Sequence, residues 1–156
     1  GMGISIATGL GIAFKKKKVG NKVFVIVGDG ECNEGSNWES LMAAAHYQLD
    51  NLVIFVDKNN FQQTGACRDI LGTDSLSEKF KSFNCFSQEI DGHNHSQIYN
   101  AICKNLNSPR PNLIVANTTK GKGISLFENK NEWHHSVLTK KIYEEAITDL
   151  KKNYDY

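Results

Sequence analysis

The sequence predicts an α/β domain: a three-layer sandwich in which helices cover both faces of a mostly parallel central sheet. Three short apolar runs, at residues 22–27, 51–56 and 111–119, have the composition of buried strands. Segments with helical spacing of apolar residues separate them, and strands that alternate with helices are typical of parallel sheets. Because crossovers between parallel strands are right-handed, the strands' carboxyl ends share one edge of the sheet, where such folds bind ligands.

The elements are expected in a regular order along the chain. They are a helix rich in small residues at 3–14, a strand buried on both faces at 22–27, a helix at 37–49, a strand at 51–56, a short helix at 76–83, a weak strand at 84–90, a helix at 96–106, a strand at 111–119, and an amphipathic helix at 139–152 that starts at a Thr139 N-cap. In helix 37–49, Trp38, Leu41, Met42, Ala45 and Leu49 recur at helical spacing, so this stripe is expected to face the core.

Composition limits the class of protein. The chain has 156 residues, enough for one domain with a real core, and its net charge of +1 gives no electrostatic reason to bind nucleic acid. The four cysteines are widely spaced, which favours reduced thiols and a cytoplasmic location over a disulfide framework or a zinc site. The apolar runs are far shorter than the ~20 residues of a membrane-spanning helix, so we expect no membrane association.

The segment GDGECNEG, at residues 28–35, directly follows the first buried strand. Asp29 ends that strand, and Asn59 lies just past the end of the next one. Neighbouring strands lie ~4.8 Å apart, so the two side chains can converge on one point. Their oxygens and a nearby backbone carbonyl would form half of an octahedron, which suits Mg²⁺ completed by phosphate oxygens and water.

The glycines in the same segment would give backbone access to an anion. Gly28 and Gly30 leave room for a bulky group, and the N–H groups of the following helix would point at it. A diphosphate would be repelled by Asp29 and Glu34, and the segment contains no Lys or Arg, so a divalent cation is required if the ligand is a phosphate. The alternative is a plain turn whose acids cap a helix. The spacing of this segment fits neither an EF-hand nor a Rossmann fingerprint, and KGKGIS at residues 120–125 lacks the spacing of a P-loop.

These residues resemble the thiamine diphosphate motif, GDG followed by an asparagine 30 residues after its aspartate. The surrounding text is similar to the diphosphate-binding (PP) domain of transketolase. GMGISIATGLGIA resembles the family's glycine-rich helix, and GDGECNEGSNWESLMAAAHYQLDNLVIFVDKNNFQQTG resembles its core motif. EIDGHNHSQI and TTKGKGISLFENKNEWHH resemble two later family stretches. The resemblance covers almost all of residues 1–156 as one domain that lacks the N-terminal start of the family domain.

The resemblance implies specific roles. Asp29, Asn59 and the backbone carbonyl of Phe61 would ligate Mg²⁺, and Gly28, Gly30 and Asn59 would contact the diphosphate. His134 would contact substrate hydroxyls and move protons, although His135 stands where the family has glycine.

Two further roles concern residues outside that ligand set. Glu34 would belong to a carboxylate network near the subunit interface, with helix-start stabilisation as its structural alternative. His93 and His95 are expected to be turn and capping residues.

The family's activating glutamate lies in a second domain, so this chain implies half of an active site. The expected partner is a pyrimidine-binding C-terminal domain or subunit, within a homodimer or heterotetramer. The implied reaction is the transfer of a two-carbon ketol unit between sugar phosphates. The alternatives are a 1-deoxyxylulose-5-phosphate synthase, a ketol transferase of specialised sugar metabolism and, in another class, an inactive cofactor-binding module.

Overall fold

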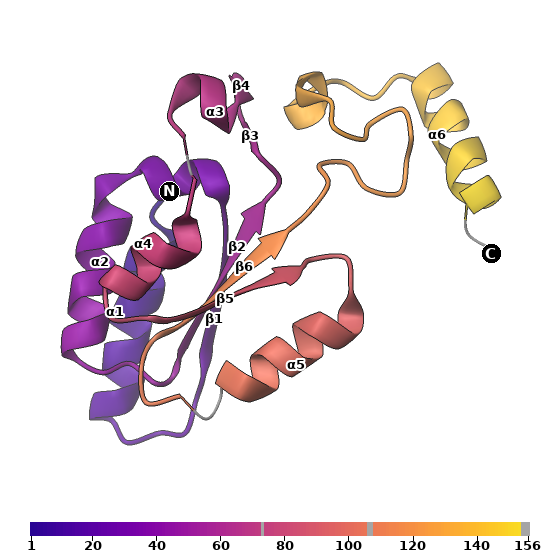
Figure 1. The fold of residues 1–156 in the computed structure, drawn as a ribbon. Coiled ribbons are helices and arrows are strands. Elements are labelled where there is room, and N and C mark those ends of the chain that lie inside the picture. The colour runs from indigo at the N-terminus through magenta and orange to yellow at the C-terminus, as the bar shows by residue number, and fades with distance from the viewer. Residues whose placement is uncertain (73, 106–107, 154–156) are drawn as a thin grey trace.

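A four-stranded parallel sheet forms the centre of the molecule in the computed structural model, which describes residues 1–72, 74–105 and 108–153 (Figure 1). The strand order is β1 (Val23–Gly28), β2 (Leu52–Lys58), β6 (Asn112–Asn117) and β5 (Phe86–Asp91). All three neighbouring pairs are parallel, so the predicted parallel sheet and its strands are confirmed. The carboxyl ends of β1 and β2 are neighbours, with Gly28 opposite Asp57.

Helices cover both faces of the sheet, which confirms the three-layer architecture. On one face lie α1 (Gly3–Lys16), α2 (Gly35–His46) and α4 (Leu76–Ser82), and on the other lies α5 (His95–Asn105) (Figure 1). The larger core joins residues of α1, α2 and α4 to one face of the sheet. The smaller core joins Ala101 of α5 to Val53, Ile114 and Ile90 on the opposite face.

The expectation that strand 22–27 is buried on both faces is wrong. The side chains of Val23 and Val27 are buried, but Phe24 is 51% exposed and Ile26 is 74% exposed. Alternate side chains of a strand point to opposite faces, and β1 is the edge strand of the sheet. The helix α5 packs over the other strands and leaves this part of the second face uncovered.

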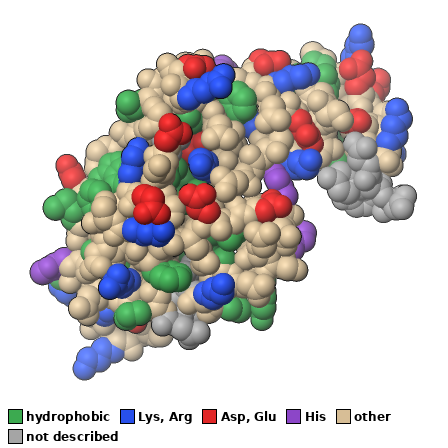
Figure 2. Space-filling view, viewed as in Figure 1, with side chains coloured by type: hydrophobic (Ala, Val, Ile, Leu, Met, Phe, Trp, Pro, Cys, Tyr) green, Lys and Arg blue, Asp and Glu red, His purple; other side chains and the backbone are tan. Residues whose placement is uncertain are grey.

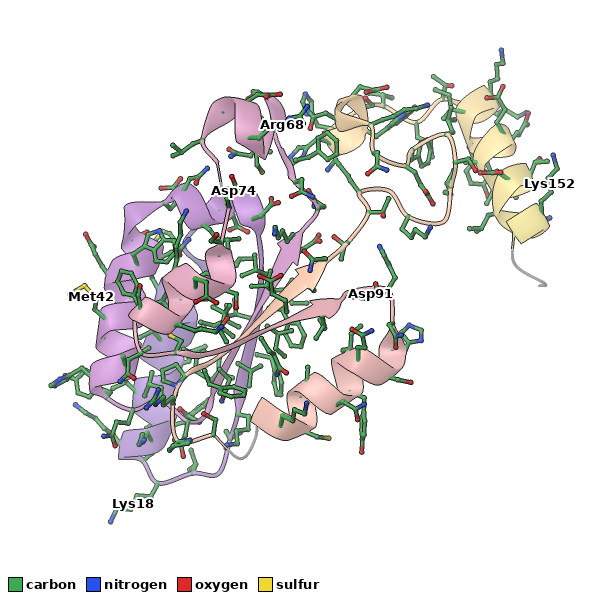
Figure 3. All side chains as sticks on the ribbon, viewed as in Figure 1. Lys18, Met42, Arg68, Asp74, Asp91 and Lys152 are labelled. Atoms are coloured by element: carbon green, nitrogen blue, oxygen red, sulfur yellow. The ribbon has the colours of Figure 1, made fainter. Side chains whose placement is uncertain are left out.

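The predicted apolar stripe of helix 37–49 is only partly correct. Leu41 is fully buried and Trp38 stacks on Phe80 of α4 at 5.0 Å between ring centroids, but Met42 is 62% exposed and points away from the sheet (Figure 3). The buried positions of α2 are Asn37, Leu41 and Ala44, at helical spacings of four and three, and Met42 lies one residue round the helix from that line.

The loops at the carboxyl edge contain short elements that periodicity could not predict. They are the 3₁₀ helices η1 (Asp29–Asn33) and η2 (Asn131–His134), the small antiparallel pair β3 (Phe61–Gln62) and β4 (Gly65–Ala66), and the single turn α3 (Cys67–Ile70). The segment that starts at Asp29 of GDG is a 3₁₀ helix, and the helix expected at 37–49 is observed as α2, two residues earlier at its start and three at its end.

The last helix, α6 (Lys140–Asn153), begins after Thr139 as expected, and the Thr139 hydroxyl accepts a hydrogen bond from the Ile142 N–H at 3.4 Å. It lies beyond the carboxyl edge of the sheet rather than on either face (Figure 1). The helix expected at 96–106 is observed, and its last expected residue falls outside the described part of the chain.

The surface carries acidic and basic side chains that are interspersed over the visible face (Figure 2). No disulfide joins the four cysteines, all of which lie in the described part of the chain. Among the described residues, no helix combines the length and apolar character needed to cross a bilayer.

Candidate functional site

A hollow of about 410 Å³ opens at the carboxyl ends of β1 and β2, and we call it the strand-end hollow. Loops that are far apart in the sequence meet there because parallel strands end at one edge. Its lining residues are Gly1, Gly28, Gly30, Glu31, Glu34, Asn59, Phe61, Gln62, Gln63, Lys120 and His134. Six of the seven residues that the sequence singled out therefore line one hollow, and the seventh, Asp29, lies fully buried between Gly28 and Gly30.

Asp29 has an unusual environment for a carboxyl group. Its side chain is 0% exposed, and Oδ2 accepts a hydrogen bond from the Asn60 backbone N–H at 2.6 Å. Oδ1 is buried without a hydrogen-bond partner among the described residues. Burial raises the pKa of Asp29 and the nearby Asp57 carboxylate adds to this, while hydrogen bonds from Asn60, Cys67 and Gly30 oppose it. A buried carboxyl oxygen without a partner is costly, so a ligand at this atom would offset a cost that the described residues leave in place.

The Asn59 side chain is held firmly on the neighbouring strand end. Its Oδ1 accepts a hydrogen bond from the Phe61 N–H at 2.9 Å, and its Nδ2 donates to Asp57 Oδ2 at 3.3 Å. Asp57 Oδ1 in turn accepts a hydrogen bond from the Thr118 hydroxyl. An amide oxygen has two lone pairs, so Asn59 Oδ1 retains one for a further ligand.

The absence of a side chain has a different consequence at Gly28 and at Gly30. A Cβ on Gly28 would meet only Glu31 Oε2, at 3.9 Å, so space on that side is open. A Cβ on Gly30 would lie 2.8 Å from Gln62 Cγ, so glycine at this position allows the Gln62 side chain to approach the backbone closely. Gly28 has a φ of −75°, which any residue adopts, so space rather than backbone conformation explains glycine there.

Glu31 and Asn33, to which the sequence assigned no role, have structural ones. Glu31 Oε2 accepts a hydrogen bond from the Gly28 N–H at 2.8 Å and satisfies the start of η1. Asn33 Nδ2 donates to the Leu71 carbonyl at 3.1 Å and ties η1 to the segment after α3. Glu34 is 60% exposed on the rim of the hollow, directly before α2.

Lys120 is the basic residue of the hollow that sequence reasoning missed, and Gln62 and Gln63 were missed as well. Its Nζ lies 3.3 Å from His134 Nδ1, so the glycine-rich stretch after β6 and the helix η2 meet at the hollow. The segment 28–35 has no basic residue, and the tertiary structure brings one to it from 90 positions further along the chain. The KGKG pattern was the available signal, but its spacing alone does not tell where the lysine lies.

Two contacts position the loop that carries Lys120. His93 Nε2 accepts a hydrogen bond from the Thr119 N–H at 2.8 Å, which gives this histidine a structural contact rather than a place in the hollow. Gly121 has a φ of +72°, and a Cβ there would lie 2.6 Å from the Phe127 carbonyl oxygen. Glycine is therefore required at this turn both for its left-handed backbone and for space.

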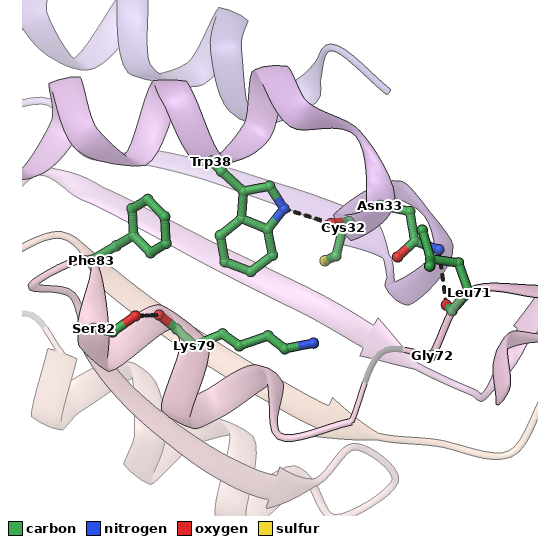
Figure 4. A pocket seen from close by; sticks show the side chains of 8 residues that line it. All are labelled: Cys32, Asn33, Trp38, Leu71, Gly72, Lys79, Ser82 and Phe83. Atoms are coloured by element: carbon green, nitrogen blue, oxygen red, sulfur yellow. Dashed lines mark hydrogen bonds between the residues drawn. The ribbon is translucent and has the colours of Figure 1, made fainter.

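A second hollow of about 360 Å³ lies between η1, α2 and α4, lined by Cys32, Asn33, Trp38, Leu71, Gly72, Lys79, Ser82 and Phe83 (Figure 4). Two of its polar groups already have partners inside the protein: Trp38 Nε1 donates to the Cys32 carbonyl at 2.8 Å, and Asn33 Nδ2 donates to the Leu71 carbonyl. Burial raises the pKa of the Cys32 thiol to about 12, so this thiol is unreactive near neutral pH. The strand-end hollow is therefore the stronger candidate site.

Within the described ranges, no group of three or more His, Cys, Asp or Glu side chains could hold a metal ion. The ligand set expected at the strand-end hollow does not need such a group, because it combines one carboxylate with an amide oxygen and a backbone carbonyl. Fold and hollow together define a parallel α/β domain with a candidate ligand site at its strand ends.

The family model of the transketolase thiamine diphosphate-binding domain matches residues 1–156, and the chain belongs to this family. It is 42% identical over 151 residues to an apulose-4-phosphate transketolase subunit of Actinobacillus succinogenes, covering 97% of this chain and 55% of that protein. It is 36% identical over 153 residues to a 6-deoxy-6-sulfo-D-fructose transketolase subunit of a Clostridium species, covering 97% and 56%.

Among solved structures, the transketolase of Campylobacter jejuni matches with a TM-score of 0.90 and 26% identity, covering 96% of this chain and 25% of that one. The chain therefore has the fold of the thiamine diphosphate-binding domain, as its sequence predicted. It spans about half the length of the curated relatives described above.

Proposed function

We propose that this chain supplies the magnesium- and diphosphate-binding half of a thiamine diphosphate-dependent ketol transferase. The observation that carries the proposal is the fully buried Asp29, whose Oδ1 lacks a partner beside a hollow lined by Gly28 and Asn59. Oxygen ligands of this kind suit Mg²⁺, which takes its remaining ligands from phosphate and water. The open side of Gly28 supports an anion in the same place.

In this proposal Asp29 Oδ1, Asn59 Oδ1 and the Phe61 carbonyl hold the cation, and Gly30 lies against the diphosphate. Lys120 adds a positive charge at the hollow, which offsets the acids Glu31 and Glu34. The bound cofactor supplies stabilisation of the carbanion formed from the sugar, and the protein orients it and handles protons.

His134 is the proton-handling residue of the proposal. It lines the hollow and lies exposed, and its Nδ1 lies 3.3 Å from Lys120 Nζ, which as an ammonium can only donate, so Nδ1 is the acceptor of this contact. The remaining nitrogen is then a donor for a substrate hydroxyl. Glu34, exposed on the rim, would face the neighbouring subunit rather than the reacting atoms.

The pyrimidine end of the cofactor requires a second polypeptide or domain, and we propose a partner that provides it. Relatives named as transketolase subunits, of which this chain spans about half, support an assembly of separate subunits. The two relatives are named for apulose-4-phosphate and 6-deoxy-6-sulfo-D-fructose, which favours a specialised sugar or sugar phosphate as substrate over the common pentose phosphates.

Calorimetric titration of thiamine diphosphate in the presence of Mg²⁺, with the assembled protein, tests the proposal. We expect Asp29→Ala to abolish Mg²⁺-dependent binding, and unchanged affinity in this variant would refute the metal-ligand role. His134→Ala should slow turnover and leave cofactor affinity within a few-fold, so a large loss of affinity would contradict its substrate role.

Lys120→Met tests the charge argument separately. Removing one charge-assisted contact costs about 1.5–3 kcal/mol, so affinity for thiamine diphosphate should fall about 10–100-fold. Lys122→Met is the matched control, because Lys122 pairs with Glu128 at 3.4 Å and does not line the hollow. Equal affinities of the two variants would show that Lys120 does not contact the diphosphate.

A further inference from the structure

The helix α1 turns apolar residues toward solvent. The only polar side chains between residues 3 and 14 lie against the rest of the protein, since Ser5 Oγ is 2.7 Å from Ser40 Oγ of α2 and Thr8 is 4% exposed. The exposed residues from 2 to 14 all lack a polar side chain, and we call them the outer face of α1: Met2, Ile6, Gly9, Leu10 and Ala13. A helix that is apolar all round is normally buried on every side, so the outer face lacks the cover that its composition requires.

The outer face is a continuous line along the helix. Residues 2, 6, 9 and 13 follow one another at spacings of four, three and four, so they lie on one side of α1, and Leu10 lies beside them. Met2 is 69% exposed and Ile6 is 60% exposed, although both are large apolar side chains. A contiguous apolar surface of this kind marks a contact with another protein surface.

Gly9, at the middle of the outer face, has no reason inside this chain to be glycine. A Cβ there would meet no atom within 4 Å, whereas a Cβ on Gly11 of the same helix would lie 3.1 Å from Leu49 Cδ1. Glycine is unfavourable inside a helix, and a close approach of another chain is one of the reasons to have it there. Gly9 is therefore an independent sign of a partner on this face.

The two ends of the outer face carry opposite charges. Glu34, which is 60% exposed, has its Oε1 3.8 Å from the Gly1 nitrogen, directly before α1 begins. Lys16 and Lys17 are exposed at the other end of the helix. A partner that matches both ends carries the same charges in the reverse direction, and a second copy of this chain placed antiparallel does so.

We propose that the outer face of α1 packs antiparallel against the outer face of α1 in a second copy of this chain, about a twofold axis next to Gly9. Ile6 then lies opposite the partner's Ala13, and Gly9 lies opposite the partner's Leu10. Large side chains thus meet small ones along the whole contact, and every contact occurs twice, as twofold symmetry requires. The inference goes beyond the proposed function, because neither the cation nor the cofactor enters it.

Disulfide cross-linking in the intact protein tests both the surface and the direction of packing. The variant carries Ile6→Cys and Ala13→Cys, with the exposed Cys103 replaced by serine. Positions 6 and 13 of one helix are about 10.5 Å apart, and a disulfide needs Cα atoms within about 7 Å, so a bond between them joins two copies. We expect mild oxidation to give covalent dimers in which mass spectrometry finds the 6–13 linkage. The two single variants should give few dimers, because an antiparallel pair keeps position 6 away from its own copy.

Sedimentation velocity of Ile6→Lys measures the strength of the contact. The side chain is exposed within one chain, so the fold should tolerate lysine, but two copies each lose a buried isoleucine at the interface. We expect the dissociation constant between copies to rise about 100-fold. Tyr99→Lys is the matched control, because Tyr99 is 68% exposed on α5, on the opposite face of the sheet, and this variant should assemble like the parent.

Each outcome decides the inference. The 6–13 linkage together with weaker assembly of Ile6→Lys alone supports it. A 6–6 linkage would show parallel packing, and a linkage to a different polypeptide would show another occupant; either result overturns the proposal. Parent-like assembly of Ile6→Lys, or equal weakening in Tyr99→Lys, overturns it as well. None of these results changes the expected binding of thiamine diphosphate, so the inference and the proposed function fail separately.

Discussion

Replacing Asp29 by asparagine should separate the stability of the fold from its ability to bind the cation. The Asp29 carboxyl group is fully buried, Oδ1 has no partner among the described residues, and Asp57 lies close by, so burial and this neighbour raise its pKa. Asparagine keeps an acceptor for the Asn60 N–H and removes the buried charge. We therefore expect Asp29→Asn to stabilise the ligand-free protein, against the usual direction of a substitution in a buried site.

The magnitude follows from the unpartnered oxygen. A buried polar group without a partner costs about 1–3 kcal/mol, and more when it is charged. Asparagine places an amide NH₂ where Oδ1 was, so the part of the cost that comes from the charge should disappear. For a domain of this size each kcal/mol changes the melting temperature by about 2–4 °C. In the parent, Mg²⁺ and thiamine diphosphate at 100 times the dissociation constant should add about 2.7 kcal/mol of stability, and the variant should lose this increment.

Thermal denaturation followed by circular dichroism, with and without Mg²⁺ and thiamine diphosphate, measures both effects. Asp57→Asn is the matched control, because both carboxylate oxygens of Asp57 accept hydrogen bonds, from Asn59 and Thr118, and this variant should lower the melting temperature. The reasoning fails if ligand-free Asp29→Asn melts below the parent, or if it keeps the ligand-induced increase.

Two other predictions concern the loop after β6 and the cysteines. Gly121→Ala should destabilise the protein by about 2–4 kcal/mol in denaturant titration, because it combines a left-handed backbone with a contact to the Phe127 carbonyl; a loss below about 0.5 kcal/mol would contradict the close approach. Alkylation by iodoacetamide at pH 8, followed by mass spectrometry, should modify exposed Cys103 first, since burial raises the pKa of Cys32 and Cys85 to about 12; rapid labelling of either in the folded protein would refute the burial argument.

Local pattern predicted the architecture because parallel strands and their crossovers leave strong traces in the sequence. The runs at 22–27, 51–56 and 111–119 all became neighbouring parallel strands. The sequence contains no comparable signal for the order of the strands or for the edge position of β1. Phe24 and Ile26 are as apolar as buried residues, and their exposure depends only on whether a helix packs over them in the tertiary structure.

The predicted site residues were found near one another for a similar reason. GDG and the asparagine that follows the next strand are separated by one helix, so topology alone brings Asp29 and Asn59 to neighbouring strand ends. The roles of these residues as ligands remain predictions. The acids Glu31 and Asp57 could not be distinguished from ligands by type, and their hydrogen bonds to Gly28 and Thr118 give them structural roles.

The sequence by itself determined the fold class, the strand-end location of the site and the family, because each depends on short-range periodicity and on motifs of adjacent residues. The tertiary structure alone decided which distant side chains meet there. Lys120 and Cys67 arrive through a glycine-rich loop and a two-stranded turn, whose positions depend on long-range contacts that leave no periodic signal in the chain. Lys120 brings a positive charge to the hollow, and the Cys67 N–H donates to the carbonyl of Asn60, whose own N–H donates to the buried Asp29.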